Sequence, residues 1–209
     1  MDKKNIYIIR HGETDYNKLG IVQGSGADIE LNSRGLEQAQ FFYNFYKNIS
    51  FDVIFISALK RTYQTVKAFI DMGVAYKVIP ELNEISWGIL EGKMQTQQNK
   101  EIYWNVVNQW RSGKYDAKIE NGESANELYN RLSIAANKIF NRNTNGNILV
   151  CMHGRAMKAF LCLLLNQPLS NMDYFEHSNT CVYQLITNDF KTFEIIKQNN
   201  IEHLTQNLV

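Results

Sequence analysis

The chain has 209 residues, of which 44% are hydrophobic and 21% are charged. This is the balance of an ordinary globular protein, and it excludes a disordered, collagen-like or disulfide-stapled chain. Lysine and arginine number 22 against 21 acidic residues, so the net charge is +1 and no global field exists to hold a nucleic acid backbone. Because no repeat, low-complexity tract or linker divides the chain, we expect residues 1–209 to form a single domain.

The apolar runs and the cysteines indicate in which compartment of the cell the protein is expected. The longest apolar run, residues 160–165, is far shorter than the ~20 residues that cross a bilayer. Residues 6–9 are too few for the apolar part of a secretory signal. Cys151, Cys162 and Cys181 form no C-x-x-C pair, which is typical of reduced thiols. We therefore expect a cytoplasmic protein with neither a membrane nor a nucleic acid as partner.

Short runs of β-branched and aromatic residues alternate with stretches of helical periodicity along the chain. This alternation predicts an α/β fold, namely a three-layer α/β/α sandwich with a mostly parallel central sheet and helices on both faces. The last two runs are candidates for an antiparallel edge. The expected strands cover residues 5–9, 53–56, 75–79, 147–152, 181–186 and 192–196, and the expected helices include residues 36–46, 66–70, 128–139 and 157–164.

Two helix starts and one irregular stretch complete the predicted layout. Ser124 and Glu127 have the spacing of a capping box, which predicts that a helix begins after Ser124. Residues 31–35 predict the start of the first long helix. Residues 93–122 are the least regular part, polar in places yet carrying four aromatic side chains. They form either a lid or insertion over a pocket or a peripheral helix whose aromatic residues pack on the core.

Two predicted strands end in nearly the same tripeptide, Arg10-His11-Gly12 and Met152-His153-Gly154. Ligands of open α/β sheets bind beyond the carboxyl ends of the strands. A histidine at such a position is held by a rigid scaffold, and the glycine lets the backbone approach a ligand closely. A lone histidine in a turn is more often structural, whereas two of only four histidines in the same context favour chemistry.

A third strand end adds Arg61. The run at residues 53–57 leads into a predicted helix N-terminus, where free N–H groups and the helix dipole favour anions. Arginine suits phosphate because its planar fork gives two parallel, permanently charged hydrogen bonds. Alone, Arg61 would be read as a surface charge, but together with Arg10, His11 and His153 it completes a phosphate clamp.

An alkoxide leaves a phosphate ester poorly unless a proton reaches it, so a general acid is needed. Glu84 lies just past the predicted strand at residues 75–79, at an edge where a pocket can form. Glu81 is its rival, and the residues alone do not decide between the two.

The segment Arg-His-Gly-Glu-Thr at residues 10–14, after a short strand, resembles the signature of the histidine phosphatase superfamily, which is phosphoglycerate mutase-like. Further segments match the family in the same order along the chain. The resemblance favours Glu84 over Glu81. The matching segments are Asn17, Gln23-Gly24, residues 31–35, residues 57–62, residues 82–92, residues 121–124 and residues 152–154.

The resemblance implies that His11 attacks phosphorus, while Glu84 protonates the departing oxygen and then activates the water that hydrolyses the phosphohistidine. It places Arg10, Arg61 and His153 around the phosphoryl oxygens, without a metal. We expect a backbone carbonyl at residues 12–14 to fix the His11 tautomer. The expected substrate-binding residues are Asn17, Gln23, Gly24 and Gly154.

Within the family we expect a phosphomonoester hydrolase that acts on a small phosphorylated metabolite and needs no cofactor. The alternative is a phosphoglycerate mutase that depends on 2,3-bisphosphoglycerate. Mutases hold a carboxylate with basic residues in the insertion after the acid segment, whereas the insertion here is short, and Arg155 replaces the usual asparagine after His-Gly. The basic residues it offers are Lys93, Lys100, Arg111, Lys114 and Lys118, in no spacing that matches the mutase pattern.

A third possibility is a non-catalytic module that binds a phosphorylated ligand. The presence of both His11 and Glu84 disfavours it. The other two histidines, His177 and His203, belong to no matched segment, and we expect both to be structural.

Overall fold

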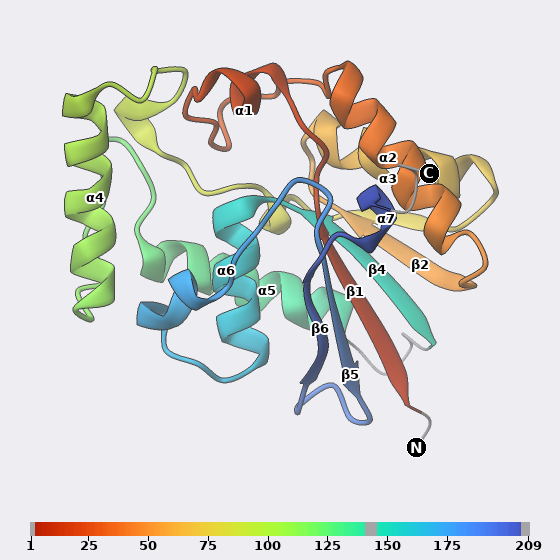
Figure 1. Ribbon diagram of the computed structural model, residues 1–209. Coiled ribbons are helices and arrows are strands. Elements are labelled where there is room, and N and C mark those ends of the chain that lie inside the picture. Colours follow the sequence, from red (N-terminus) through yellow and green to blue (C-terminus); the bar gives the residue numbers. More distant parts are fainter. Residues whose placement is uncertain (1–2, 141–145, 206–209) are drawn as a thin grey trace.

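The computed structural model describes residues 3–140 and 146–205. A six-stranded sheet, ordered β3-β2-β4-β1-β5-β6, lies between two layers of helices (Figure 1). The pairs β1–β4, β2–β4 and β2–β3 are parallel, whereas β5 is antiparallel to both of its neighbours. The predicted α/β sandwich and its antiparallel edge are therefore confirmed. The strands are β1 (Lys4–Arg10), β2 (Phe51–Ile56), β3 (Tyr76–Val78), β4 (Asn147–Met152), β5 (Val182–Thr187) and β6 (Glu194–Asn200).

Helices cover both faces because side chains alternate along the buried strands. In β1, Ile6 and Ile8 belong to one hydrophobic core, and Tyr7 and Ile9 belong to the other. The core of Tyr7 and Ile9 is closed by α2 (Ser33–Tyr46) and α3 (Lys60–Asp71), with the short α7 (Glu202–Thr205) beside α2; the core of Ile6 and Ile8 is closed by α5 (Ala125–Ile139) and α6 (Gly154–Leu164).

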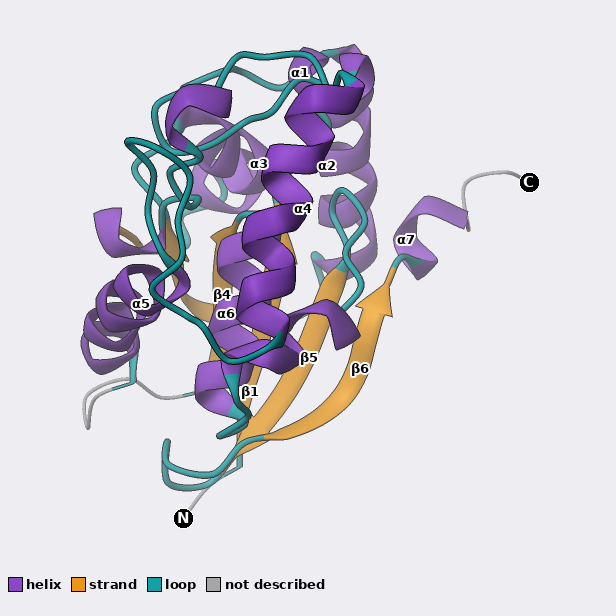
Figure 2. Cartoon of the chain, turned by 90° about the vertical axis from the view of Figure 1, so that its left-hand side faces the viewer, coloured by secondary structure: helices purple, strands orange, loops and turns teal. Residues whose placement is uncertain are grey.

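The irregular stretch at residues 93–122 contains a helix, α4 (Gln97–Arg111), which stands beyond α6 at the end of the molecule away from α2 and α3 (Figures 1 and 2). Trp110 is 1% exposed and stacks on Trp87, with 5.9 Å between the ring centroids. The prediction of a peripheral helix that packs aromatic residues on the core is confirmed, while a moving lid stays a prediction.

Short elements connect these layers. They are α1 (Asp15–Leu19) and the 3-10 turns η1 (Pro80–Leu82), η2 (Gly88–Leu90) and η3 (Leu169–Tyr174). Among the residues that the structure describes, no helix combines the length and the apolar character needed to cross a membrane.

Both predicted helix starts are present. The Ser124 hydroxyl accepts from the backbone N–H of Glu127 at 3.1 Å, and the Glu127 carboxylate accepts from the N–H of Ser124 at 2.7 Å. At α2, the Asn32 side chain accepts from the N–H of Gly35 at 2.9 Å. Local capping chemistry thus fixes where α5 and α2 begin.

The loop after β1 is pressed against the first turn of α2. The Glu13 carbonyl accepts from the Asn32 N–H at 3.0 Å, and the Glu13 N–H donates to Gln38 at 2.8 Å. A Cβ placed on Gly35 would lie 2.1 Å from the Glu13 carbonyl oxygen, well inside contact distance. Only glycine at position 35 allows α2 to support the segment that begins with His11.

We expect Gly35→Ala to destabilise the protein by about 1–3 kcal/mol, because the added methyl group forces the loop and the helix apart. In an ordinary helix interior, the same change would stabilise by ~1 kcal/mol. Urea unfolding measures the difference, with Asn44→Ala at an exposed position of the same helix as control. A Gly35→Ala protein that is as stable as the wild type would show that this contact is not tight.

Candidate active site

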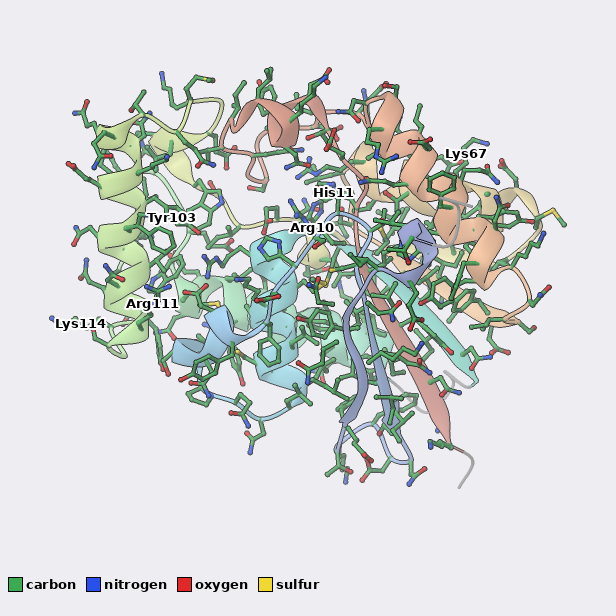
Figure 3. All side chains as sticks on the ribbon, viewed as in Figure 1. Arg10, His11, Lys67, Tyr103, Arg111 and Lys114 are labelled. Carbon is green, nitrogen blue, oxygen red and sulfur yellow. The ribbon has the colours of Figure 1, made fainter. Side chains whose placement is uncertain are left out.

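A cavity of about 520 Å³ lies where the ends of β1 and β4 meet the inner side of α4. Five of the nine predicted site residues are in its wall, and His11, Arg61 and His153 are buried next to them. Figure 3 shows Arg10 and His11 together near the carboxyl end of β1, with Tyr103 on the facing helix. The lining residues are Arg10, Asn17, Ile21, Val22, Gln23, Glu84, Trp87, Gln95, Asn99, Lys100, Tyr103, Trp104, Gly154, Arg155 and His177.

His11 is 3% exposed and follows β1 directly. Its Nδ1 lies 2.7 Å from the Gly12 carbonyl oxygen, which can only accept, so Nδ1 carries the proton and Nε2 keeps its lone pair. The expected backbone carbonyl is thus present. The ring centroids of His11 and His153 are 5.2 Å apart, so the two strand ends bring both imidazoles to one place.

Both imidazoles are uncharged at neutral pH. Burial, followed by the charges of Arg61 and Arg10, holds the pKa of His11 well below its usual value. Burial and the charge of Arg61 do the same to the pKa of His153. An unprotonated Nε2 on His11 is what a nucleophile requires.

Arg61 is completely buried at the start of α3. Its Nε donates to His153 Nδ1 at 3.1 Å, its Nη1 to the Ala27 carbonyl at 2.6 Å and its Nη2 to the Gly24 carbonyl at 3.3 Å. With its amide oriented to satisfy both neighbours, Gln23 also accepts from Arg61 Nη1 at 3.0 Å. Gln23 and Gly24 therefore hold the guanidinium of Arg61.

His153 is engaged at both ring nitrogens. Nδ1 accepts from Arg61, and Nε2 lies 2.8 Å from the Ser57 hydroxyl. In the free protein, His153 therefore orients Arg61. A hydrogen bond from His153 to a ligand requires one of these two contacts to be exchanged.

The Arg10 guanidinium uses only some of its N–H donors in contacts with the described residues. Its Nη1 donates to His177 Nδ1 at 3.1 Å. Its Nε is shielded from solvent and has no hydrogen-bond partner among residues 3–140 and 146–205. Because buried guanidinium N–H groups are rarely left unpaired, this atom points to a bound anion as its missing acceptor.

Glu84 lies in the cavity wall at the N-terminus of α6 and is 7% exposed. Its carboxylate accepts from the backbone N–H groups of Ala156 at 2.8 Å and Arg155 at 3.1 Å. Glu81 instead forms an ion pair outside the cavity. The structure thus places Glu84, and not Glu81, in the wall of the cavity at the ends of β1 and β4.

Asn17 and Gly154 also line the cavity. Asn17 Oδ1 accepts from Asn179 Nδ2 at 3.2 Å, and the same Asn179 amide donates to the His11 carbonyl at 3.1 Å. These contacts turn Asn17 toward the site. Asn179 itself lies in the turn that precedes β5.

His177 was expected to be structural, and the structure places it next to Arg10. His177 is in the cavity wall and accepts from Arg10. Its position depends on the antiparallel pairing of β5 with β1, which no local pattern in the sequence reveals. His203, for which the same was expected, is buried with its Nε2 3.0 Å from the Thr180 hydroxyl.

Arg155 was noted in the sequence only as a departure from the family pattern, and it connects α6 to α4. Its Nη1 donates to Asp173 at 3.0 Å, its Nη2 donates to the Tyr103 hydroxyl, and its guanidinium lies 5.9 Å from the centroid of the Trp110 ring. Arg111 of α4 reaches the same Asp173 at 2.8 Å. This ion pair and its aromatic surroundings fix the inner side of α4 over the cavity.

Within the described ranges, no three His, Cys, Asp or Glu side chains gather in an arrangement that could hold a metal ion. The chemistry that the site offers is therefore that of guanidiniums, imidazoles and one carboxylate. Metal independence itself stays a prediction.

We expect acid to destabilise the fold through its buried histidines. Burial lowers the pKa of His11 and His153, brings that of His177 to about 3 and that of His203 to about 4, whereas unfolded histidines titrate near 6.5. Below about pH 6.5, histidines of the unfolded chain bind protons, whereas the buried histidines of the native state stay unprotonated. The free energy of unfolding therefore falls by up to ~1.4 kcal/mol per pH unit for each histidine.

Urea unfolding between pH 7 and pH 5 tests this, because ordinary carboxylates titrate mostly below that window. His177→Asn removes one titrating group and should make the pH dependence shallower. Stability that stays flat or rises on acidification would contradict the buried, neutral histidines.

Comparison with known proteins agrees with this geometry. The histidine phosphatase superfamily (branch 1) matches residues 6–201. Phosphoserine phosphatase 1 of Hydrogenobacter thermophilus is 30% identical over 201 residues, which cover 95% of this chain and 93% of the relative. Probable phosphoglycerate mutase GpmB of Yersinia pestis is 32% identical over 165 residues, which cover 78% of this chain and 75% of the relative.

A crystal structure of a putative alpha-ribazole-5'-P phosphatase from Escherichia coli has a TM-score of 0.83 with this fold at 28% identity, and the match covers 95% of this chain and 97% of that one. The family match spans nearly the whole chain. Arg10 and Glu84 line one cavity, and His11, Arg61 and His153 are buried beside it. The chain is an enzyme of the histidine phosphatase superfamily, branch 1.

Proposed function

We propose that the protein hydrolyses a small phosphorylated metabolite through a phosphohistidine formed on His11. The observation that carries this proposal is a neutral His11 whose Nδ1 proton is held by the Gly12 carbonyl, near the charges of Arg10 and Arg61 and beside a cavity that Glu84 lines. Relatives named as phosphatases support hydrolysis of a phosphomonoester.

In the first step, His11 Nε2 attacks phosphorus, the bond from phosphorus to the ester oxygen breaks, and Glu84 gives its proton to the departing alcohol. In the second step, the Glu84 carboxylate takes a proton from water, and the resulting hydroxide attacks phosphorus. The nitrogen–phosphorus bond breaks, inorganic phosphate leaves, and both residues return to their starting states.

The cations around His11 serve both steps. They oppose protonation of His11, so the nucleophile stays available, and they attract the phosphate dianion. Arg10 offers its unpartnered Nε to a phosphoryl oxygen, and Arg61 adds a second fixed charge. Charge held in place before the reaction is the main contribution that a protein makes to phosphoryl transfer.

We propose further that the enzyme needs neither a metal nor an organic cofactor, because guanidiniums supply the charge that a metal would otherwise bring. Residues 1–209 would form one histidine phosphatase domain, with residues 93–122 as the variable cover that selects the substrate. Cytoplasmic location stays a prediction from the sequence.

A phosphoglycerate mutase is the second candidate, because relatives from Yersinia bear that name. The basic residues of the insertion argue against it. Of the five, only Lys100 lines the cavity, while Arg111 pairs with Asp173 and Lys118 with Glu127, and Lys114 points away at the end of α4 (Figure 3). Phosphate release against isomerisation of 3-phosphoglycerate, with and without 2,3-bisphosphoglycerate, separates the two activities.

We expect His11→Ala to lower kcat by at least ~10³-fold and to abolish acid-labile labelling by a phosphorylated substrate, because the variant lacks the proposed nucleophile. Lys67→Gln is the control, because Lys67 is exposed on α3 far from His11 (Figure 3). Turnover of His11→Ala at a near-normal rate would remove the nucleophile assignment.

Glu84→Gln should slow an alkyl phosphate by ~10²-fold or more, because the alkoxide then leaves without a proton. An aryl phosphate, whose phenoxide leaves more readily, should lose much less. The neighbouring Glu81→Gln is the matched control and should affect neither substrate. Equal losses for alkyl and aryl phosphates would count against the acid role of Glu84.

A further inference from the structure

We infer that His177 is a positioning residue for Arg10: it orients the guanidinium as a neutral hydrogen-bond acceptor and leaves its positive charge available for the phosphoryl group. This inference rests on the proposed function, in which Arg10 binds that group. The contact joins residues 167 positions apart, at a histidine that lies outside the family's matched segments.

The backbone fixes His177 beside Arg10. The antiparallel register pairs Ile9 with Val182, so the segment that precedes β5 runs alongside the end of β1. The Arg10 N–H donates to the Cys181 carbonyl at 3.2 Å, and the Thr180 N–H donates to the Arg10 carbonyl at 3.1 Å. These bonds tie the loop that carries His177 directly to the strand that carries Arg10.

The His177 ring is wedged between Arg10 and the start of α6. Nδ1 accepts from Arg10 Nη1, so the proton of the neutral ring is on Nε2. A Cβ on Gly154 would lie 3.1 Å from Cε1 and 3.2 Å from Nε2 of this ring. The glycine after His153 thus makes room for His177, and the ring has little freedom to leave Arg10.

The charged groups that act on His177 are cations. Arg10 comes from β1, Arg155 and Lys158 come from α6, and the neutral His11 lies nearby. Burial and these charges lower the pKa of His177 to about 3, so the ring is neutral at the pH of the cell.

The neutrality of the acceptor matters for the anion that Arg10 has to bind. A carboxylate in place of His177 would hold Arg10 as firmly, but it would cancel the positive charge and repel a phosphate. With an imidazole as acceptor, Arg10 keeps a full charge and a free Nε donor. The arrangement therefore predicts that acceptor geometry and acceptor charge have separate effects on phosphate affinity.

Three variants separate these effects. His177→Phe keeps much of the ring volume but removes the acceptor, and it should weaken binding of inorganic phosphate about tenfold. His177→Asp keeps an acceptor but adds a negative charge, and the loss should reach about a hundredfold. His177→Asn keeps a neutral acceptor and should recover most of the affinity lost in the other two.

Calorimetric titration with inorganic phosphate, together with kcat and KM for an aryl phosphate, provides the readout. Each variant is also made in an Arg10→Ala background. If His177 acts through Arg10, His177→Phe causes little further loss there, whereas a merely structural role gives the same loss in both backgrounds. Asp and Asn are nearly isosteric, so their comparison decides the matter even if His177→Phe fails to fold.

The outcomes also separate this inference from the proposed function. A wild-type protein that binds phosphate with the expected coupling, yet hydrolyses no ester, overturns the proposed function and supports the role of His177. A wild-type protein that hydrolyses esters, while His177→Asp and His177→Asn bind phosphate equally well, overturns the role of His177 alone. Absence of phosphate binding in the wild type overturns both.

Discussion

Burial of the Arg61 guanidinium is the constraint on which the site depends. Taking a charge out of water costs several kcal/mol unless every donor finds an acceptor. Here the acceptors are two backbone carbonyls, an imidazole and an amide, all of them neutral. These four acceptors satisfy most of the five N–H groups, and none of them cancels the charge. A positive potential remains inside the protein. Burial, with this potential added to it, lowers the pKa of both His11 and His153 and keeps their imidazoles unprotonated.

Positive charge that is held by neutral acceptors is also a feature of the cavity as a whole. Arg10 also has an imidazole as acceptor. Among the described residues that line the cavity, Glu84 is the single acidic side chain, whereas the basic ones are Arg10, Lys100 and Arg155. Its carboxylate is held by the backbone N–H groups of Ile85 and of the start of α6, and in the part of the chain that the structure describes no arginine or lysine side chain donates to it. Anion binding and proton transfer are thus assigned to different groups, which is what hydrolysis of a phosphate ester requires.

Much of the fold followed from local patterns, because the apolar runs and capping residues act over a few positions. For α4 the sequence left a lid and a peripheral helix open, because the segment has no single apolar stripe: Trp110 packs on the core, whereas Tyr103 and Trp104 line the cavity. The strand ends pointed to Arg10, His11 and His153 without any comparison. The choice of Glu84 needed the family resemblance, and His177 could not be found at all, since only the register between β1 and β5 brings it to Arg10.

A crystal structure with orthovanadate, which copies the five-coordinate phosphorus of the transition state, tests the central claim most directly. We predict vanadium bonded to His11 Nε2, equatorial oxygens within hydrogen-bond distance of Arg10 and Arg61, and an apical oxygen facing Glu84. Vanadate bound elsewhere, or bound in the cavity without contact to His11, would contradict it.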